Sequence, residues 1–279
     1  MRLARTVLLA LLGMAFLAPL AWMVNASLKA EGEAVVSPVA PPEVARWENY
    51  GAALRQMGAF DDSGPYAGFL QLAANTLLIT ALSIAFQILT CSLAGYAFAR
   101  LRFRGRDVLF VLVLAAMMLP AQALVIPQFV LFQQLGWIDT FLPLLVPCLL
   151  GGSPFFIFLF RQSFLTIPRD VVEAARLDGC GAFGVYLRVM LPLSRPVVAT
   201  VAIFTFLAAW NDLWTPLIYL SSPENQTLTL ALAGFSRTYR VAVEHLMAAS
   251  TIVLLPCVVV YFLAQKTLVR GVQLSATKG

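Results

Sequence analysis

Charged side chains are scarce in this chain of 279 residues. Asp, Glu, Lys and Arg together make up 12% of it, which is about half the share usual in a soluble globular domain. Hydrophobic residues make up 60%, and the mean hydropathy is +0.84. This balance argues against a soluble fold and is typical of a membrane protein.

Residues and motifs typical of metal sites and of catalysis are also few. The chain has one histidine, His245, with no cysteine or second histidine nearby, so no metal site is predicted. It has no G-x-S-x-G, no H-E-x-x-H and no G-x-x-x-x-G-K-[S/T] motif, and none of its three lysines follows a glycine. The chain is therefore predicted to be neither an enzyme nor its own P-loop ATPase. Cys91, Cys148 and Cys257 lie in apolar segments and are interpreted as packing residues, and Cys180 is not expected to form a disulfide.

The charges that are present leave long uncharged gaps. Five gaps hold at least 21 residues each, and a sixth apolar segment is interrupted only by Asn211 and Asp212. A helix of about 20 residues crosses a hydrocarbon core of roughly 30 Å. The segments are apolar all round, which favours helices over a barrel. The sequence predicts an all-α polytopic fold with six transmembrane helices over residues 6–28, 72–99, 108–132, 140–160, 197–220 and 246–265.

The basic residues indicate how the chain is oriented. With the N-terminus in the cytoplasm, the inner side holds 14 basic residues and the outer side five. The positive-inside rule then places both termini and the loop between the fourth and fifth spans in the cytoplasm. The excess of basic residues on the inner side explains the net charge of +5. The predicted partner of the apolar segments is membrane lipid, and the charge gives no reason to invoke nucleic acid. The inner residues are Arg2, Arg5, Arg100, Arg102, Arg104, Arg106, Arg161, Arg169, Arg176, Arg188, Arg195, Lys266, Arg270 and Lys278; the outer ones are Lys29, Arg46, Arg55, Arg237 and Arg240.

Four parts follow from this topology. Residues 1–28 form a cytoplasmic tip and the first span, which we favour over a cleaved signal peptide because it is long and lacks a clear A-x-A site. Residues 29–70 are expected to be an ordered or semi-ordered extracytoplasmic loop. Residues 71–267 form the core domain with five spans and the cytoplasmic loop 164–196, and residues 268–279 form a cytoplasmic tail.

The polar segment 168–196 carries an ordered pattern of its own. Asp170 with Glu173 three residues later is close to a capping box, so a helix is predicted to begin at Val171. Gly179 predicts its end, because glycine tolerates the left-handed conformation that commonly ends a helix. A second element is predicted over 182–189, with an apolar stripe of Phe183, Tyr186, Leu187 and Met190 at helical spacing.

The letters of this segment follow the spacing E-A-A-x3-G-x9-[I/V]-x-L-P, from Glu173 to Pro192. This spacing resembles the signature loop of the permease subunits of binding-protein-dependent ABC importers, and the resemblance implies a type I ABC importer permease fold. In that family the loop forms a coupling helix that docks into a groove of the ATPase subunit. The resemblance assigns ATPase coupling to Glu173, Ala174, Ala175, Asp178, Gly179, Phe183, Tyr186, Leu191 and Pro192.

Two alternatives stay open for this loop. The apolar stripe packs either on a partner or on the protein's own helix ends. Glu173 either contacts the partner, caps its own helix or pairs with Arg176 for about 0.2 to 0.5 kcal/mol.

Three further runs are similar to the carbohydrate branch of that family, which includes the second maltose-type permease subunit. They are Gly152–Phe156, Ala209–Asp212 and the closing Lys278-Gly279. The branch implies a sugar importer in the plasma (inner) membrane of a bacterium or archaeon, with a second homologous permease, two P-loop ATPase subunits that use ATP and Mg²⁺, and an extracytoplasmic solute-binding protein. A polyol or a glycerol phosphate is the alternative solute. No cofactor is expected in this chain.

Several residues are candidates for the substrate pathway. Asp212 is the only acid inside an apolar segment, and a charge at a helix centre costs roughly 2.5 to 3.5 kcal/mol. It is either a substrate contact or an interfacial acid, and the aromatic rings beside it either stack on a sugar or form an interfacial belt. Prolines 120, 127, 143, 147 and 154 suggest kinked helices around a cavity. The candidates are Gln122, Gln128, Trp210, Asn211, Asp212 and Trp214.

Two other classes of protein fit the sequence less well. An ion-coupled secondary transporter needs an intramembrane relay, for which Asp212 alone is poor, and commonly an internal repeat. A membrane enzyme needs a reactive constellation near an interface, and the sequence offers none.

Overall fold

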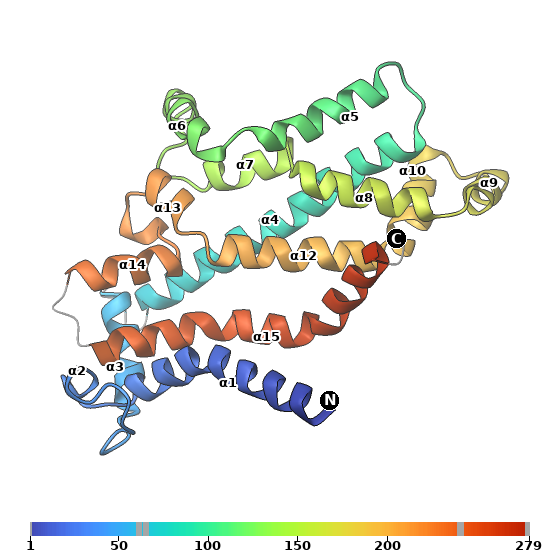
Figure 1. The fold of residues 1–279 in the computed structure, drawn as a ribbon. Helices are drawn as coiled ribbons and strands as arrows, with labels where there is room; N and C mark the ends of the chain where they lie inside the picture. The colour runs from blue at the N-terminus through green and yellow to red at the C-terminus, as the bar shows by residue number, and fades with distance from the viewer. Residues whose placement is uncertain (1, 60–62, 64–66, 239–242, 277–279) are drawn as a thin grey trace. The chain divides into compact units, whose positions relative to one another are not determined.

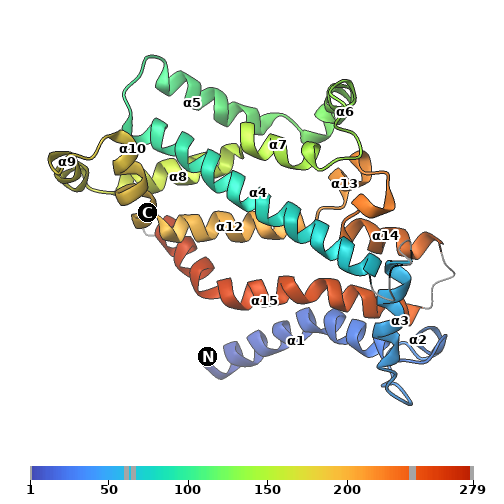
Figure 2. The same ribbon diagram turned by 180° about the vertical axis from the view of Figure 1, so that it is seen from behind.

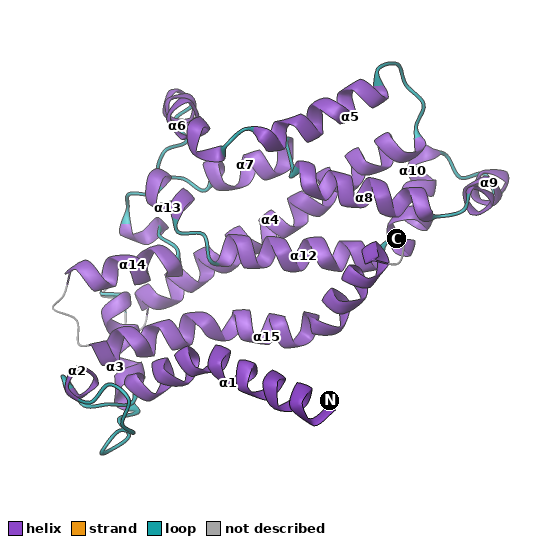
Figure 3. Cartoon of the chain, in the orientation of Figure 1, coloured by secondary structure: helices purple, strands orange, loops and turns teal. Residues whose placement is uncertain are grey.

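The computed structural model describes residues 2–59, 63, 67–238 and 243–276 (Figure 1). All the regular structure in this described part is helical, as Figure 3 shows, which confirms the all-α prediction. The chain divides into two compact units. One comprises Met1–Asn75 with Ser222–Val258, and the other Thr76–Ser221 with Val259–Gly279, so the division falls within two long helices, α4 and α15.

The described residues contain four single helices long and apolar enough to cross a membrane. Two further candidate spans are helix pairs bent at a short break. If each bent pair is one span, the number is six, as predicted. The single spans are Arg5–Ser27, Gly68–Arg100, Leu142–Thr166 and Val243–Gln265; the bent pairs are Arg106–Met118 with Ala121–Gln134, and Ala182–Leu193 with Arg195–Trp210.

The first unit contains the N-terminal helix and the segments packed against it. Figures 1 and 2 show α1 lying beside the part of α15 that belongs to this unit. Its elements are α1 (Arg2–Ser27), α2 (Glu33–Val36), α3 (Glu48–Met57), the start of α4 (Ala67–Arg100), the 3-10 turn η4 (Pro223–Asn225), α14 (Leu228–Thr238) and α15 (Val243–Ala276) as far as Val258. Residues 268–276, predicted as a tail, continue the helix α15.

Within residues 29–59, side-chain contacts hold the chain against the end of α1. Asn49 on α3 donates hydrogen bonds from Nδ2 to the carbonyl oxygens of Ser27 at 2.9 Å and Lys29 at 2.8 Å. The hydroxyl groups of Ser27 and Tyr50 share another at 2.8 Å. These bonds satisfy carbonyl groups that a helix end leaves without intrahelical partners. The predicted ordered loop therefore contains two short helices held against α1.

The second unit contains most of the apolar helices. In chain order these are the rest of α4, α5 (Arg106–Ala115), the 3-10 turns η1 (Ala116–Met118) and η2 (Ala121–Leu124), α6 (Val125–Gln134), α7 (Leu142–Leu150), α8 (Pro154–Thr166), α9 (Arg169–Leu177), α10 (Ala182–Val185), the π-helical turn η3 (Tyr186–Met190), α11 (Leu191–Leu193), α12 (Arg195–Trp210) and α13 (Trp214–Tyr219). The second part of α15 also belongs to this unit.

The third span is not the continuous helix predicted over residues 108–132. Its two halves, Arg106–Met118 and Ala121–Gln134, meet at 92°. Leu119 is extended, because a residue that precedes a proline is pushed out of the helical region, and Pro120 is extended as well. The kink predicted at Pro120 is confirmed as a complete break.

The other candidate prolines do not break helices in the same way. Pro143 and Pro154 lie in the first turns of α7 and α8, where a missing N–H group costs little. Pro127 lies near the start of α6, and Pro147 lies inside α7, which ends soon afterwards. Most of these prolines therefore mark helix beginnings, and the prediction of a kink at each is wrong.

The predicted span 197–220 is not one continuous helix. Helix α12 ends at Trp210 and α13 is a separate helix of six residues. The 16 residues of α12 extend about 24 Å at 1.5 Å per residue, which is less than the roughly 30 Å of a hydrocarbon core. The polar residues Asn211 and Asp212 follow directly, and their side chains compete with the backbone for helical hydrogen bonds.

Gly95 allows α4 to pack closely against α8. A Cβ atom added at Gly95 would lie 2.6 Å from Cβ of Phe160 and 3.0 Å from the backbone nitrogen of Arg161. Small residues permit this kind of backbone approach between membrane helices. The position therefore requires glycine for steric reasons.

We predict that Gly95→Val destabilises the protein by about 1 to 3 kcal/mol through overpacking. Thermal denaturation of detergent-purified protein measures the change. Gly13→Val is the matched control, because an added Cβ at Gly13 on α1 has no atom within 4 Å. Equal denaturation midpoints for the two variants would contradict the packing argument.

Candidate functional site

The motif loop, residues 168–196, begins with α9, and this helix ends in a Schellman motif. Gly179 has φ of +84°, in the left-handed region. The N–H of Gly179 donates to the carbonyl oxygen of Arg176 at 3.0 Å, and the N–H of Cys180 donates to that of Ala175 at 3.0 Å. These two bonds satisfy carbonyl groups of the last turn and define the motif. The number of residues between Ala175 and Gly179 is thus the number that a Schellman motif requires. The helix end predicted at Gly179 is confirmed.

The start of α9 differs from the prediction. The helix begins at Arg169, not at Val171, and Pro168 occupies the N-cap position without a side-chain hydrogen bond. The capping box is therefore absent. Pro168 has ψ of 147°, outside the helical region, so the regular helix begins only at the next residue. Asp170 lies in the first turn instead, where a carboxylate interacts favourably with the helix dipole.

The second half of the motif loop is a single helical run with an irregular centre. It runs over Ala182–Leu193 and includes the π-helical turn η3. The N–H of Leu191 donates to the carbonyl oxygen of Tyr186, five residues earlier. The next residue, Pro192, has no N–H group and cannot donate a helical hydrogen bond. The π-helical turn therefore lies where the regular series of α-helical hydrogen bonds would be interrupted. The predicted element over 182–189 is confirmed and extends farther.

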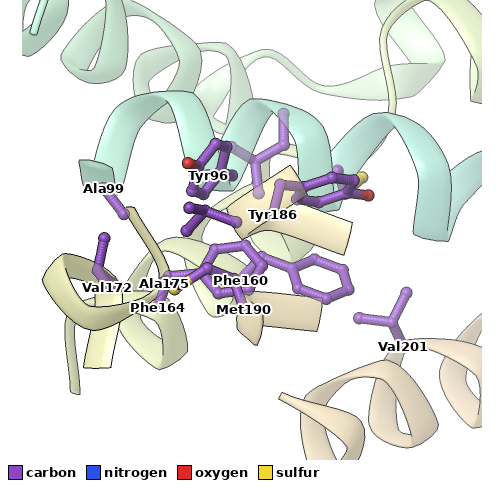
Figure 4. Packing of buried hydrophobic residues seen from close by; sticks show 12 residues of the cluster. Tyr96, Ala99, Phe160, Phe164, Val172, Ala175, Tyr186, Met190 and Val201 are labelled. Atoms are coloured by element: carbon purple, nitrogen blue, oxygen red, sulfur yellow. The ribbon is translucent and has the colours of Figure 1, made fainter. Parts of the chain in front are cut away.

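Helix α4 holds this run through two tyrosines. Tyr96 Oη donates to the carbonyl oxygen of Ala182 at 2.9 Å, and the hydroxyl groups of Tyr186 and Ser92 are 2.8 Å apart. The rings of Tyr96 and Tyr186 lie with centroids 5.5 Å apart, and Figure 4 shows both between α4 and the motif loop. The loop is therefore attached to a membrane-spanning helix by polar and aromatic contacts together.

A buried apolar cluster completes this attachment. Figure 4 shows residues of α8, α9 and η3 meeting around Phe160 and Phe164, whose rings stack 5.8 Å apart. The stripe predicted on the second element divides between two environments. Tyr186 and Met190 are buried in the cluster, whereas Phe183 and Leu187 are exposed. The buried members are Cys91, Tyr96, Ala99, Ile157, Phe160, Phe164, Val172, Ala175, Val185, Tyr186, Met190 and Val201.

The other predicted coupling residues lie on both sides of the motif loop. Ala175 is buried in the cluster, and Leu191 and Pro192 are half-buried. Glu173, Ala174, Asp178 and Gly179 are exposed. Leu177, which the sequence analysis did not select, is 89% exposed, and Phe183 is 66% exposed. The loop thus presents an exposed surface, defined by Glu173, Ala174, Leu177, Asp178 and Phe183, while its opposite face packs on the protein itself.

Arg100 fixes the chain immediately before the motif loop. Its Nε and Nη2 donate to the carbonyl oxygen of Phe164 at 3.1 and 2.6 Å, and Nη2 also donates to the carbonyl oxygen of Ile167. These carbonyl groups belong to the end of α8, which carries no basic residue of its own in its last turn. The last residue of α4 therefore caps α8.

A break between α7 and α8 uses the run Gly152-Ser153-Pro154. Gly152 has φ of +59°, and a Cβ added there would lie 2.7 Å from Sγ of Cys91. The freed N–H of Ser153 donates to Oε1 of Gln87 on α4 at 2.9 Å. The sequence analysis did not select Gln87. A glutamine in an otherwise apolar span was the available signal, because a polar group there requires a partner.

The pathway candidates near residue 212 lie together at the junction of α12 and α13. Trp210 is buried and stacks on Phe206, with centroids 5.4 Å apart, so its ring face is already covered on that side. Asn211 is exposed, and Asp212 accepts at Oδ1 from the N–H of Thr215 at 3.1 Å, which orders the start of α13. Trp214 is exposed.

The two glutamine candidates lie on other helices. Gln122 is on η2 and Gln128 is on α6, and both side chains are exposed. They follow the break at Pro120 and are not part of the junction at residues 210–214. Their place in a pathway stays a prediction.

The fold and this site define a polytopic helical membrane protein whose polar loop is anchored to its own spanning helices and keeps one face exposed. Residues 91–274 match the family of binding-protein-dependent transport system inner membrane components, and the chain belongs to this family. The match includes the motif loop, α8 and the end of α4 from Cys91 onward.

Individual relatives agree with this assignment. The chain is 30% identical to the arabinooligosaccharides transport system permease protein AraQ of Bacillus subtilis (strain 168), over 100% of this chain and 96% of the relative. It is 32% identical to the maltodextrin transport system permease protein MdxG of the same organism, over 76% of each chain. Its fold is similar to a chain in the crystal structure of a bacterial ABC transporter involved in the import of the acidic polysaccharide alginate, with a TM-score of 0.79, 25% identity and 95% of each chain covered.

We predict that Gly179→Val loosens the end of α9. A β-branched residue with positive φ costs about 1 to 2 kcal/mol, which raises the open fraction of the cap roughly 5- to 30-fold. Hydrogen–deuterium exchange at the Cys180 amide measures this fraction. Gly181→Val is the matched control, because neither glycine has an atom within 4 Å of an added Cβ and only Gly179 has positive φ. Unchanged Cys180 exchange in Gly179→Val would overturn the cap assignment.

Proposed function

We propose that this chain is the membrane permease subunit of an ATP-driven sugar importer and that the motif loop couples it to a separate ATPase. The observation that carries the proposal is the construction of the motif loop. One face is built into the cluster with α4 and α8, and the other exposes apolar side chains next to the signature residues. A partner that moves the exposed face moves the spanning helices with it.

The chemistry of the exposed surface supports a protein partner. Leu177 and Phe183 are large apolar residues whose side chains are largely exposed, and Ala174 permits a close approach. Aromatic and aliphatic anchors in a polar rim are typical of the energetic centre of a protein interface. We assign the contact with the ATPase to Glu173, Ala174, Leu177, Asp178 and Phe183, and a supporting role inside the loop to Ala175, Gly179, Tyr186, Leu191 and Pro192.

The sugar as substrate rests on the relatives, whose names give arabinooligosaccharides and maltodextrin as their transported compounds. The family implies an extracytoplasmic binding protein and a second permease, so we propose an assembly with one homologous permease, two ATPase subunits and a solute-binding protein. ATP and Mg²⁺ then act in the ATPase. The excess of basic residues on one side of the spans supports cytoplasmic termini and a cytoplasmic motif loop.

Co-purification tests the assembly directly. The tagged chain is extracted from native membranes in mild detergent, and the retained proteins are identified by mass spectrometry. Recovery of a P-loop ATPase and a second related permease is the expected result. Recovery of this chain alone, under conditions that keep other membrane complexes intact, would favour a self-sufficient transporter instead.

Substitution of an exposed anchor should weaken the ATPase contact. We predict that Leu177→Arg lowers the amount of ATPase recovered with the chain, because truncation or charging of an interface anchor costs at least about 1 kcal/mol, or roughly fivefold in affinity. Val36→Arg is the control, since Val36 is an equally exposed apolar residue on α2 in the first unit. Full ATPase recovery with Leu177→Arg would exclude this residue from the interface.

Transport should depend on the rigid end of α9. We predict that Gly179→Val abolishes or strongly lowers ATP-dependent sugar uptake by the whole importer in cells, while membrane insertion is unchanged, and that Gly181→Val retains most uptake. The physical reason is that a loosened cap no longer transmits displacement from α9 to the buried cluster. Full uptake by Gly179→Val would refute the coupling role of the loop.

A further inference from the structure

An open cavity lies where the chain passes from α4 to α5. It has a volume of about 520 Å³, within the usual range of small-ligand sites, and it is lined by Arg102, Phe103, Gly105, Arg106, Asp107 and Val108. The segment carries four arginines at alternate positions, from Arg100 to Arg106. The proposed coupling to an ATPase makes no use of this cavity.

The four arginines differ in what they contact. Arg100 is engaged with the end of α8, and Arg106 forms an ion pair with Asp107 at 2.9 Å. Asp107 is the only acidic residue lining the cavity, and this pair leaves little net charge of its own. Across the residues that the structure describes, neither Arg102 nor Arg104 has a carboxylate within 4 Å, and both are exposed. The segment therefore offers two guanidinium groups to an external anion, and that of Arg102 belongs to a residue lining the cavity.

The same cavity has an apolar side. Phe103 and Val108 line it, and both are exposed. The exposed apolar surface continues along α5 through Leu109, Val111 and Leu112. The segment joins two candidate membrane spans, one ending at Arg100 and the next beginning at Arg106, so it lies at a membrane boundary. The segment thus places positive charges beside exposed apolar side chains. This arrangement is complementary to a molecule that is anionic at one end and apolar at the other.

We propose that this cavity binds an anionic phospholipid. The guanidinium group of Arg102, which lines the cavity, holds the headgroup phosphate, since the planar arginine fork presents two parallel N–H donors to phosphate oxygens. Arg104, which lies between two lining residues in the chain, adds a second positive charge. An acyl chain lies against Phe103 and Val108 and continues along α5. Clusters of basic residues next to a spanning helix attract anionic headgroups in this way. A free phosphate would use only the cations and would leave the apolar side in water.

Native mass spectrometry of the full chain, with any subunits that stay bound, tests the proposal. Detergent-purified protein is titrated with palmitoyl-oleoyl phosphatidylglycerol or with the phosphatidylcholine of the same chains. We expect one tightly retained phosphatidylglycerol that Arg102→Gln/Arg104→Gln weakens about 25-fold, at roughly fivefold for each arginine. Arg46→Gln/Arg55→Gln, which removes the same charge from the segment 29–70, should leave it unchanged. Arg102→Lys/Arg104→Lys keeps the charge but loses the planar fork, so its binding should fall between that of the native chain and that of Arg102→Gln/Arg104→Gln.

Each other outcome overturns the proposal. An equal loss of phosphatidylglycerol binding in both double Gln variants would show that the lipid responds to the net charge of the protein and has no specific site. Displacement of phosphatidylglycerol by inorganic phosphate, or no effect of Phe103→Ser/Val108→Ser, would indicate a simple anion site. Unchanged lipid binding together with loss of a co-purifying protein would assign the arginines to a protein interface. Arg102→Gln alone, which should weaken binding about fivefold, replaces the double variant if the latter aggregates in gel filtration.

Discussion

The attachment of the motif loop to α4 is the constraint on which the rest of this architecture depends. Two hydroxyl groups one turn apart on α4, those of Ser92 and Tyr96, hold the run that begins at Ala182. A hydrogen bond contributes about 0.5 to 1.5 kcal/mol net and an aromatic pair a similar amount, so neither alone is strong. Their position around one buried cluster makes them act together, and α9 therefore cannot shift freely against the helices.

Helix α4 serves the second unit as a polar scaffold as well as a membrane span. Backbone groups freed by irregular segments at membrane depth must find partners inside the protein. Gln87 accepts from the N–H of Ser153, Thr90 donates to the carbonyl oxygen of Leu149 at 2.6 Å, and Arg100 caps the end of α8. One helix thus satisfies backbone groups at the break between α7 and α8 and also in the chain before the motif loop. This explains how the fourth span tolerates an interruption.

The sequence predicted local structure correctly where a single residue determines the backbone conformation. Gly179 predicted the end of α9, because an uncapped helix end requires a left-handed residue, and Pro120 predicted a break because a proline also restricts its neighbour. The capping box predicted at Asp170 is wrong, because the helix begins two residues earlier, with Pro168 at the N-cap position and Asp170 inside the first turn. The prolines that begin helices were misread as kinks, since the sequence does not show which side of a proline the helix occupies.

The sequence by itself determined the class of fold, the apolar segments and the spacing of the motif loop, because hydropathy and helix caps depend on neighbouring residues. Only the tertiary structure decided which face of the loop is exposed. Tyr186 and Phe183 belong to one stripe, yet one is buried against α4 and the other is exposed. The same holds for Gln87 and Arg100, whose partners lie more than 60 positions away in the chain. Such contacts depend on how helices pack, and packing is a property of the folded chain.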